Sequence, residues 1–208
     1  MSRERKRWGA ARTAAWMAAG FAAGCIPTGR LLTRALTGES LDDLGDGKPG
    51  SSNVARSVGA KAGAAVLALD AAKAFAPAQA AKLTGAGPGA VAAIGHSAKV
   101  GHIAVVKGRG AACALGAAFA MDAPMMAIDC VPLVGGSLLH HHAEAVSVTA
   151  FSLPLTSLAL HPRRPSRALG PLALILILFG ARLRGTPGVP FPATATGWWK
   201  RFWLDRDE

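Results

Sequence analysis

A run of 53 residues, 110–162, contains no Lys or Arg, and only three acidic side chains interrupt it. Soluble domains carry roughly a quarter charged residues, whereas a charge at the centre of a bilayer costs about 2.5–3.5 kcal/mol on insertion scales. The whole chain of 208 residues is 51% hydrophobic and 17% charged, and it contains 45 alanines and 25 glycines. These features predict an integral membrane protein whose helices pack through small residues.

Six apolar segments approach the length of about 20 residues that a membrane-spanning helix needs. We therefore expect an all-α, polytopic membrane helix bundle with about five to seven transmembrane helices. The fourth segment is long enough for a helix and a re-entrant stretch, and the first is read as a retained helix rather than a cleaved signal peptide. The segments are 8–26, 60–83, 87–106, 111–139, 144–160 and 168–181.

The chain carries a formal net charge of +11, and its basic residues fall into short clusters. Nucleic-acid binding is one explanation of such a surplus, but no single stripe is basic enough and it would leave the apolar bulk unexplained. We therefore expect membrane lipids as a partner and no nucleic acid. Histidines 140–142 lack ligand partners at helical spacing, so a turn is favoured over a metal site.

Two glycine-rich segments with cations separate the predicted helices. Segment 45–53 reads GDGKPGSSN, and segment 107–110 reads KGRG directly before the fourth apolar segment. Glycine permits backbone conformations in which N–H groups converge on an anion, and the start of a helix beside a cation can bind phosphate. The loops predict a phosphate-bearing substrate at the bilayer surface, with ordinary turns between helices as the alternative.

Longer stretches around these loops form a recognisable pattern. Segment 24–34 reads GCIPTGRLLTR, segment 45–56 reads GDGKPGSSNVAR, and Gly95-His96 precedes the loop at 108–110. The arrangement resembles the bacterial family of acyl-phosphate:glycerol-3-phosphate acyltransferases, whose first motif reads G-S-I-P-x-G-x-L-L-x-R followed by G-S-G-N-x-G-A-T-N-V-x-R. The resemblance covers about residues 20–120 and identifies the chain as a divergent member.

The second family motif, G-H-x-F-P…G-G-K-G, is similar to residues 95–110 here, with one extra residue between its two ends. Asp46 stands where the family has a serine, Lys48 stands where it has an asparagine, and Arg109 corresponds to the motif lysine. The third family motif, a basic stretch with Asn and Glu after the last helix, is hardly visible near residues 182–185, where its Asn and Glu have no counterpart. Asp70 and Lys73, three apart on a predicted helix, favour a structural pair over a catalytic one.

The resemblance implies a reaction in which a fatty acyl group moves from acyl phosphate to glycerol 3-phosphate, giving lysophosphatidic acid, and it implies no cofactor and no metal. It implies Asp46, Asn53 and His96 as catalytic residues, with helix packing as the alternative role of His96. The implied substrate-binding residues are Gly45, Gly47, Gly50, Ser52, Arg56, Gly108, Arg109 and Gly110. The alternative function is that of a catalytically degenerate paralogue, which binds phosphorylated lipid or regulates a membrane partner.

Two expectations concern organisation. Residues 1–186 form the membrane domain, and residues 187–208 form a proline-containing linker and an aromatic, basic tail for the membrane interface, since three of the five tryptophans fall at 198–203. The motif loops face the cytoplasm of the cell membrane, where glycerol 3-phosphate is found. The basic cluster 163–167 lies two predicted spans after the second loop and is therefore expected on the same side.

Overall fold

The computed structural model describes residues 8–185 and 189–206, and every regular element in these two ranges is helical. The basic residues at 3–7 and the expected boundary at residue 187 lie outside the described residues. The main helices are α1 (Ala10–Gly24), α2 (Thr28–Thr37), α3 (Ser51–Ser57), α4 (Ala60–Leu83), α5 (Pro88–Gly101), α6 (Ala111–Met121), α7 (Ala123–Leu138), α8 (His142–Leu160), α9 (Leu169–Arg184) and α10 (Ala195–Leu204).

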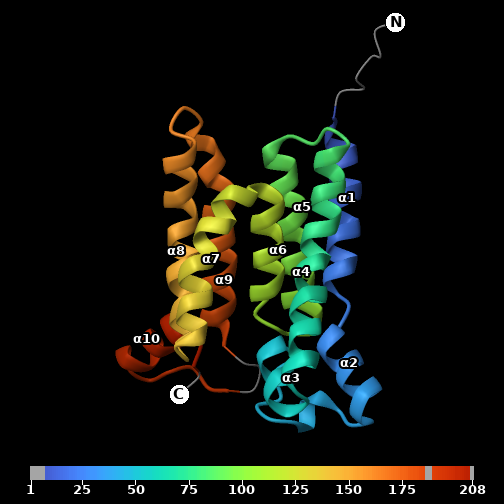
Figure 1. Cartoon of the computed structure of the whole chain (residues 1–208), viewed down its shortest axis with the longest axis vertical. Helices are drawn as coiled ribbons and strands as arrows, with labels where there is room; N and C mark the ends of the chain where they lie inside the picture. Colours follow the sequence, from blue (N-terminus) through green and yellow to red (C-terminus); the bar gives the residue numbers. More distant parts are fainter. Residues whose placement is uncertain (1–7, 186–188, 207–208) are drawn as a thin grey trace, which may run out of the picture.

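The long helices stand side by side along the long axis of the molecule, while α2, α3 and α10 lie at one end (Figure 1). Three helical stretches are long and apolar enough to cross a membrane, namely Pro88–Val106, His142–Leu160 and Pro165–Arg184. Many large apolar side chains on the outside of the bundle are exposed, as they are in a protein surrounded by lipid. The predicted all-α membrane bundle is confirmed.

Small residues bring neighbouring helices into close contact. A Cβ atom on Gly116 of α6 would lie 1.9 Å from the carbonyl oxygen of Ala71 in α4, and a Cβ on Gly24 of α1 would lie 1.9 Å from that of Ala98 in α5. No side chain fits at either position, so these helix pairs require glycine. The predicted packing through small residues is therefore present.

The fourth predicted segment differs from the expectation. Residues 111–139 form two helices, α6 and α7, which run in opposite directions in Figure 1. The chain reverses at Asp122, whose backbone is extended (φ −156°, ψ 98°) and whose carboxylate accepts a hydrogen bond from Met125 N at 3.2 Å. An N-terminal cap of this kind starts a new helix.

This additional crossing changes which loops share an end of the bundle. The connection that holds Arg163, Arg164 and Arg167 follows α8 at the end opposite to α2 and α3 (Figure 1). The expectation that this basic cluster lies on the same side as the motif loops was therefore wrong, because three helices rather than two separate it from the second loop.

Candidate functional site

A cavity of about 730 Å³ lies where the two glycine-rich loops meet, at the end of the bundle that carries α3. Its charged lining consists of six basic and three acidic side chains, which favours an anionic ligand. These are Arg30, Lys48, Arg56, Lys107, Arg109 and Arg182, with Asp46, Asp70 and Asp205. We call this space the polar cavity.

The structure brings most of the residues implied by the resemblance to this cavity. Two of them, Gly45 and His96, lie outside its lining. Those in the lining are Asp46, Gly47, Gly50, Ser52, Asn53, Arg56, Gly108, Arg109 and Gly110. Sequence positions more than 50 residues apart thus form one site.

Asn53 holds the first loop in shape. Its side chain is 1% exposed, its Nδ2 donates to the carbonyl oxygens of Leu44 (2.9 Å) and Lys48 (3.1 Å), and its Oδ1 accepts from Asp46 N at 3.2 Å. A Cβ on Gly45 (φ +60°) would lie 2.1 Å from this Oδ1, so the loop closes around the amide only with glycine there. The contacts of Asn53 are those of a loop-supporting residue.

Asp46 and Arg56 form an ion pair at the cavity edge. Arg56 Nη2 donates to Asp46 Oδ2 at 2.8 Å, and Lys48 N donates to Asp46 Oδ1 at 3.2 Å. The side chain of Asp46 is 41% exposed and that of Arg56 is 59% exposed. The carboxylate at the family's serine position is thus neutralised by Arg56, and the pair is open enough for water or a ligand to compete.

The two histidines of the second motif region have different surroundings. His96 Nε2 lies 3.0 Å from the carbonyl oxygen of Gly170, near the start of α9 and away from the polar cavity. His102, which sequence reasoning missed, lines the cavity, and its Nδ1 lies 3.9 Å from Asp70 Oδ1. His102 opens a π-helical turn, His102–Val106, which ends directly before the second loop.

The second loop joins the π-helical turn to α6. Lys107 and Gly110 both have φ of +67°, and α6 begins directly after Gly110. The N–H groups in the first turn of a helix have no intrahelical acceptor and favour an anion. Ala111, Ala112 and Cys113, which form this turn, all line the polar cavity.

Asp70 and Lys73 pair inside the bundle, with 2.5 Å between Oδ1 and Nζ. Lys73 Nζ also donates to the carbonyl oxygen of Ile26, and Thr28 donates to Asp70. The pair thereby fixes the start of α2, within the first motif, against α4. The expected pairing of these two side chains is confirmed.

Arg182 is a further cavity residue that sequence reasoning did not single out. It is 3% exposed near the end of α9, in the segment where the third family motif is hardly visible. A charge inside an apolar span is a signal of function in its own right, and that signal could have found it.

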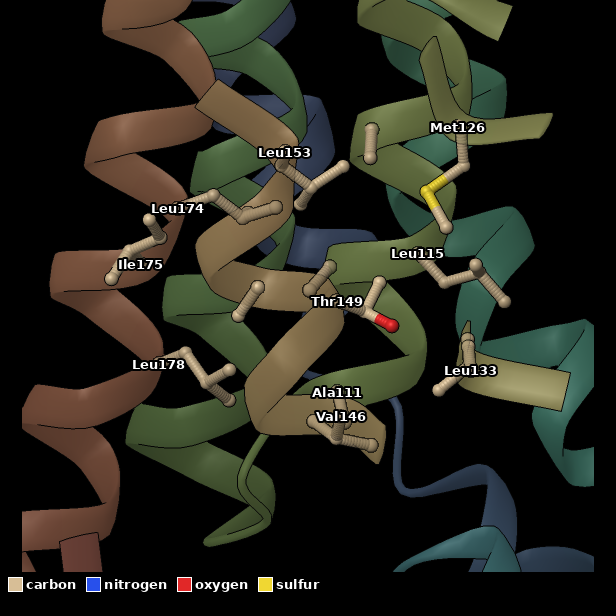
Figure 2. Close-up of a pocket in the computed structure, with 13 residues that line it drawn as sticks. Ala111, Leu115, Met126, Leu133, Val146, Thr149, Leu153, Leu174, Ile175 and Leu178 are labelled. Carbon is tan, nitrogen blue, oxygen red and sulfur yellow. The ribbon is translucent and has the colours of Figure 1, made fainter. Parts of the chain in front are cut away.

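An apolar pocket of about 60 Å³ continues from the polar cavity between α6, α7, α8 and α9. Figure 2 shows Ala111 and Val146 at one end of this pocket and Met126 and Leu153 at the other. The two spaces share five lining residues: Ala111, Leu115, Leu133, Val146 and Leu178. A ligand with an anionic head and an alkyl chain fits this combination of charge and shape.

Comparison with known proteins gives a consistent result. Residues 14–185 match the family model described as glycerol-3-phosphate acyltransferase. A glycerol-3-phosphate acyltransferase of Anaeromyxobacter sp. (strain K) is 38% identical over 180 residues, covering 78% of this chain and 86% of the relative. One from Roseobacter denitrificans is 29% identical over 173 residues, covering 81% and 83%.

The fold also has solved counterparts. The crystal structure of PlsY, an integral membrane glycerol 3-phosphate acyltransferase, in its glycerol 3-phosphate form superposes with a TM-score of 0.72 at 23% identity, covering 82% of this chain and 88% of that one. Its lysophosphatidic acid form gives a TM-score of 0.70 at 22% identity, covering 83% and 88%. At this level of identity, the likeness establishes a shared membrane fold.

Proposed function

Because the chain belongs to the glycerol-3-phosphate acyltransferase family, we propose that it transfers a fatty acyl group from acyl phosphate to the 1-hydroxyl of glycerol 3-phosphate. The products are lysophosphatidic acid and inorganic phosphate. The observation that carries the proposal is the union of a basic cavity with an apolar pocket through a shared set of lining residues. An acyl phosphate joins the same two properties in one molecule.

For this reaction, the protein mainly has to bind the two substrates and orient them toward each other. The hydroxyl oxygen of glycerol 3-phosphate attacks the acyl carbonyl carbon, the bond from that carbon to the phosphate oxygen breaks, and the hydroxyl proton is transferred to an acceptor. Arg56 in α3, which follows the first loop, and Arg109 in the second loop are the phosphate ligands that this proposal assigns. Binding both anions in one orientation supplies much of the rate enhancement.

His102 is the proton acceptor that the cavity favours. It lines the cavity beside the second loop, where a Cβ on Gly108 would lie 2.3 Å from His102 Nε2. An imidazole is suited to proton transfer near neutral pH. His102→Asn is expected to lower kcat by about 10²-fold or more, while His96→Asn leaves catalysis nearly intact. A larger loss of kcat in His96→Asn than in His102→Asn would instead make His96 the proton acceptor.

The second candidate function is that of a degenerate paralogue, because Asp46 stands where the family has a serine. A direct assay distinguishes it from the enzyme function. Purified protein in detergent is supplied with palmitoyl phosphate and labelled glycerol 3-phosphate, and labelled lysophosphatidic acid is measured. The enzyme produces it above a protein-free blank, and Arg109→Gln lowers the rate. Binding of lysophosphatidic acid without turnover would instead support the paralogue.

We also propose that the motif loops face the cytoplasm, since glycerol 3-phosphate must reach the polar cavity. Cysteine labelling tests this orientation in a chain whose Cys25, Cys113 and Cys130 are replaced. Ser51→Cys is expected to resist an impermeant thiol reagent in intact cells and to react after lysis. Arg163→Cys, at the opposite end, is the matched control and is expected to react in intact cells. The reversed pattern would place the loops outside.

A further inference from the structure

The C-terminal segment 189–206 lies beyond the residues that match the family model, yet it contributes to the polar cavity. Leu204 and Asp205, at the end of α10, belong to the cavity lining. A part of the chain that the family match leaves out therefore places a carboxylate beside the residues that the proposed function uses.

Polar contacts to α9 and α8 hold this segment in place. Arg182 Nη1 donates to the carbonyl oxygens of Phe202 and Trp203, each at 3.1 Å, and to Ser147 Oγ at 2.6 Å. Carbonyl groups in the last turn of a helix have no intrahelical donor. The buried guanidinium of Arg182 thus donates to these carbonyl groups and holds the end of α10 next to the cavity.

Aromatic packing supports the same position. The rings of Phe179 and Phe202 stack with centroids 4.3 Å apart, and those of Phe151 and Trp203 stack at 5.8 Å. Arg201 is fully buried, and its Nη2 donates to the carbonyl oxygen of Pro190 at 3.1 Å. The end of α10 is therefore packed onto the bundle by both apolar and polar contacts.

The ion pair between Asp205 and Arg109 is the consequence of this docking. Arg109 Nε lies 2.8 Å from Asp205 Oδ1, and Arg109 Nη1 donates to the carbonyl oxygen of Gly185 at 2.8 Å. The side chains are 15% and 24% exposed, for Arg109 and Asp205 respectively, so this pair is much less open than the pair of Asp46 and Arg56. Two fixed acceptors set the plane of the guanidinium in the second loop.

We propose that Asp205 is a positioning residue, which orients Arg109 for the phosphate of glycerol 3-phosphate. The proposal rests on the function proposed above. A guanidinium binds phosphate best when its fork is already aligned, and a carboxylate on Nε aligns it without leaving a partly buried charge uncompensated. A carboxylate that merely blocked Arg109 would have the opposite effect on substrate affinity.

The backbone of Asp205 offers a clean substitution. Its φ is +53°, a left-handed conformation at the end of α10 that Asn adopts as readily as Asp. Asp205→Asn therefore keeps the size and backbone of the residue and removes only the charge. Asp43→Asn, at an exposed position outside the cavity lining, is the matched control for loss of one negative charge at the same end of the molecule.

Steady-state kinetics on the full chain in detergent test the proposal. Asp205→Asn is expected to raise the KM for glycerol 3-phosphate about tenfold, as loss of a charge-assisted hydrogen bond does, with a smaller change in kcat. Asp43→Asn leaves both values unchanged. A KM that stays at the wild-type value or falls below it would overturn the proposal, and a fall would identify Asp205 as a competitor of phosphate.

A double-mutant cycle shows whether Asp205 acts through Arg109. In the Arg109→Gln background, Asp205→Asn is expected to cause no further rise in KM. An equal additional rise in that background would mean that Asp205 acts independently, and the positioning role would be wrong.

Equilibrium binding separates this proposal from the proposed function. Isothermal titration with glycerol 3-phosphate alone is expected to show about tenfold weaker binding to Asp205→Asn, whether or not the wild type forms product. A wild type that binds but does not turn over contradicts the acyltransferase function and leaves the positioning role supported. Equal binding by both proteins, or none by either, overturns the positioning role.

Discussion

Replacing Asp46 with serine is expected to strengthen binding of glycerol 3-phosphate. Two unit charges of like sign about 4 Å apart repel by roughly 4 kcal/mol at an effective dielectric constant near 20. That figure would apply to an isolated carboxylate beside a substrate phosphate. The observed Asp46 is paired with Arg56 at 2.8 Å, and both side chains are substantially exposed. The penalty is therefore much smaller than the repulsion of two bare charges.

The structure allows the size of the effect to be bounded. An exposed ion pair is worth about 0–1 kcal/mol, which is what a phosphate must overcome to take Arg56 from Asp46. At about 1.4 kcal/mol per tenfold change, Asp46→Ser is expected to lower the KM for glycerol 3-phosphate by up to about fivefold. The loop survives the change, because a serine hydroxyl can accept the hydrogen bond from Lys48 N that Asp46 now accepts.

The KM and kcat of each variant are measured with palmitoyl phosphate at saturation while the concentration of glycerol 3-phosphate is varied. Asp46→Asn is the control, since it removes the charge and keeps an acceptor for Lys48 N. A lower KM in both variants identifies the charge as the cause, and a gain in Asp46→Ser alone identifies the hydroxyl. A higher KM in both would refute the reasoning, because Asp46 would then position Arg56. A collapse of kcat at unchanged KM would make Asp46 the general base.

Arg56→Lys is expected to raise the KM for glycerol 3-phosphate more than Lys48→Ala does, since a lysine does not reproduce the guanidinium fork; equal losses in the same kinetic assay would contradict this ranking. Met126→Ala is expected to shift the preference toward longer acyl phosphates, because Met126 lies at the far end of the apolar pocket. Since the pocket takes roughly eight methylene groups, an unchanged ratio of kcat/KM for chains of about 10 and about 12 carbons would be contrary evidence. Gly116→Val is expected to lower the melting temperature in detergent markedly, since the valine side chain would collide with the Ala71 carbonyl group. The matched change Gly180→Val places the same side chain in open space and is expected to leave the melting temperature nearly unchanged.

The sequence predicts the fold class well because composition constrains it directly. A long stretch without basic residues has few alternatives to a bilayer, and the small residues that fill it allow close helix packing. The reversal at Asp122 escaped prediction, since a single capping aspartate between two apolar helices resembles an ordinary polar position within a longer one. Because this helix was missed, the basic cluster after α8 was predicted at the same end of the bundle as the motif loops, whereas it lies at the opposite end.

From local patterns alone, the site was predictable only where its residues are close in sequence, and the family resemblance brought the two loops together. The loop that holds Asp46 and Asn53 is one local unit with Arg56, so its motif gives its geometry. His102 rather than His96 lines the cavity, because six residues along a helix place the two side chains on different faces and only the end of α5 reaches the second loop. Asp205 contacts Arg109 across 96 positions, and such a contact depends on how α10 docks rather than on any local pattern.

With the proposed acyl phosphate as substrate, the boundary between the two spaces locates the reacting carbon. In an acyl phosphate, the carbonyl carbon joins the anionic head to the alkyl chain, so it must lie where the polar lining gives way to the apolar one. On α6 that change occurs between Ala111 and Leu115, because these two residues line both spaces. We infer that the N–H groups in the first turn of α6 face the carbonyl oxygen, where they can stabilise the charge that develops on it.

Photo-crosslinking with acyl phosphonates tests this placement. From Ala111 to Ala118 the apolar pocket follows α6 for seven residues, about 10 Å. Because an extended alkyl chain zigzags, it advances by less than its C–C bond length per methylene, and about 10 Å is roughly the span of eight methylene groups. A diazirine next to the carbonyl is expected to label residues 111–113, and one about eight methylenes along the chain is expected to label Met126 or Leu153. If the carbonyl-proximal probe labels Met126 instead, the chain enters in the opposite direction and the first turn of α6 does not face the reacting carbon.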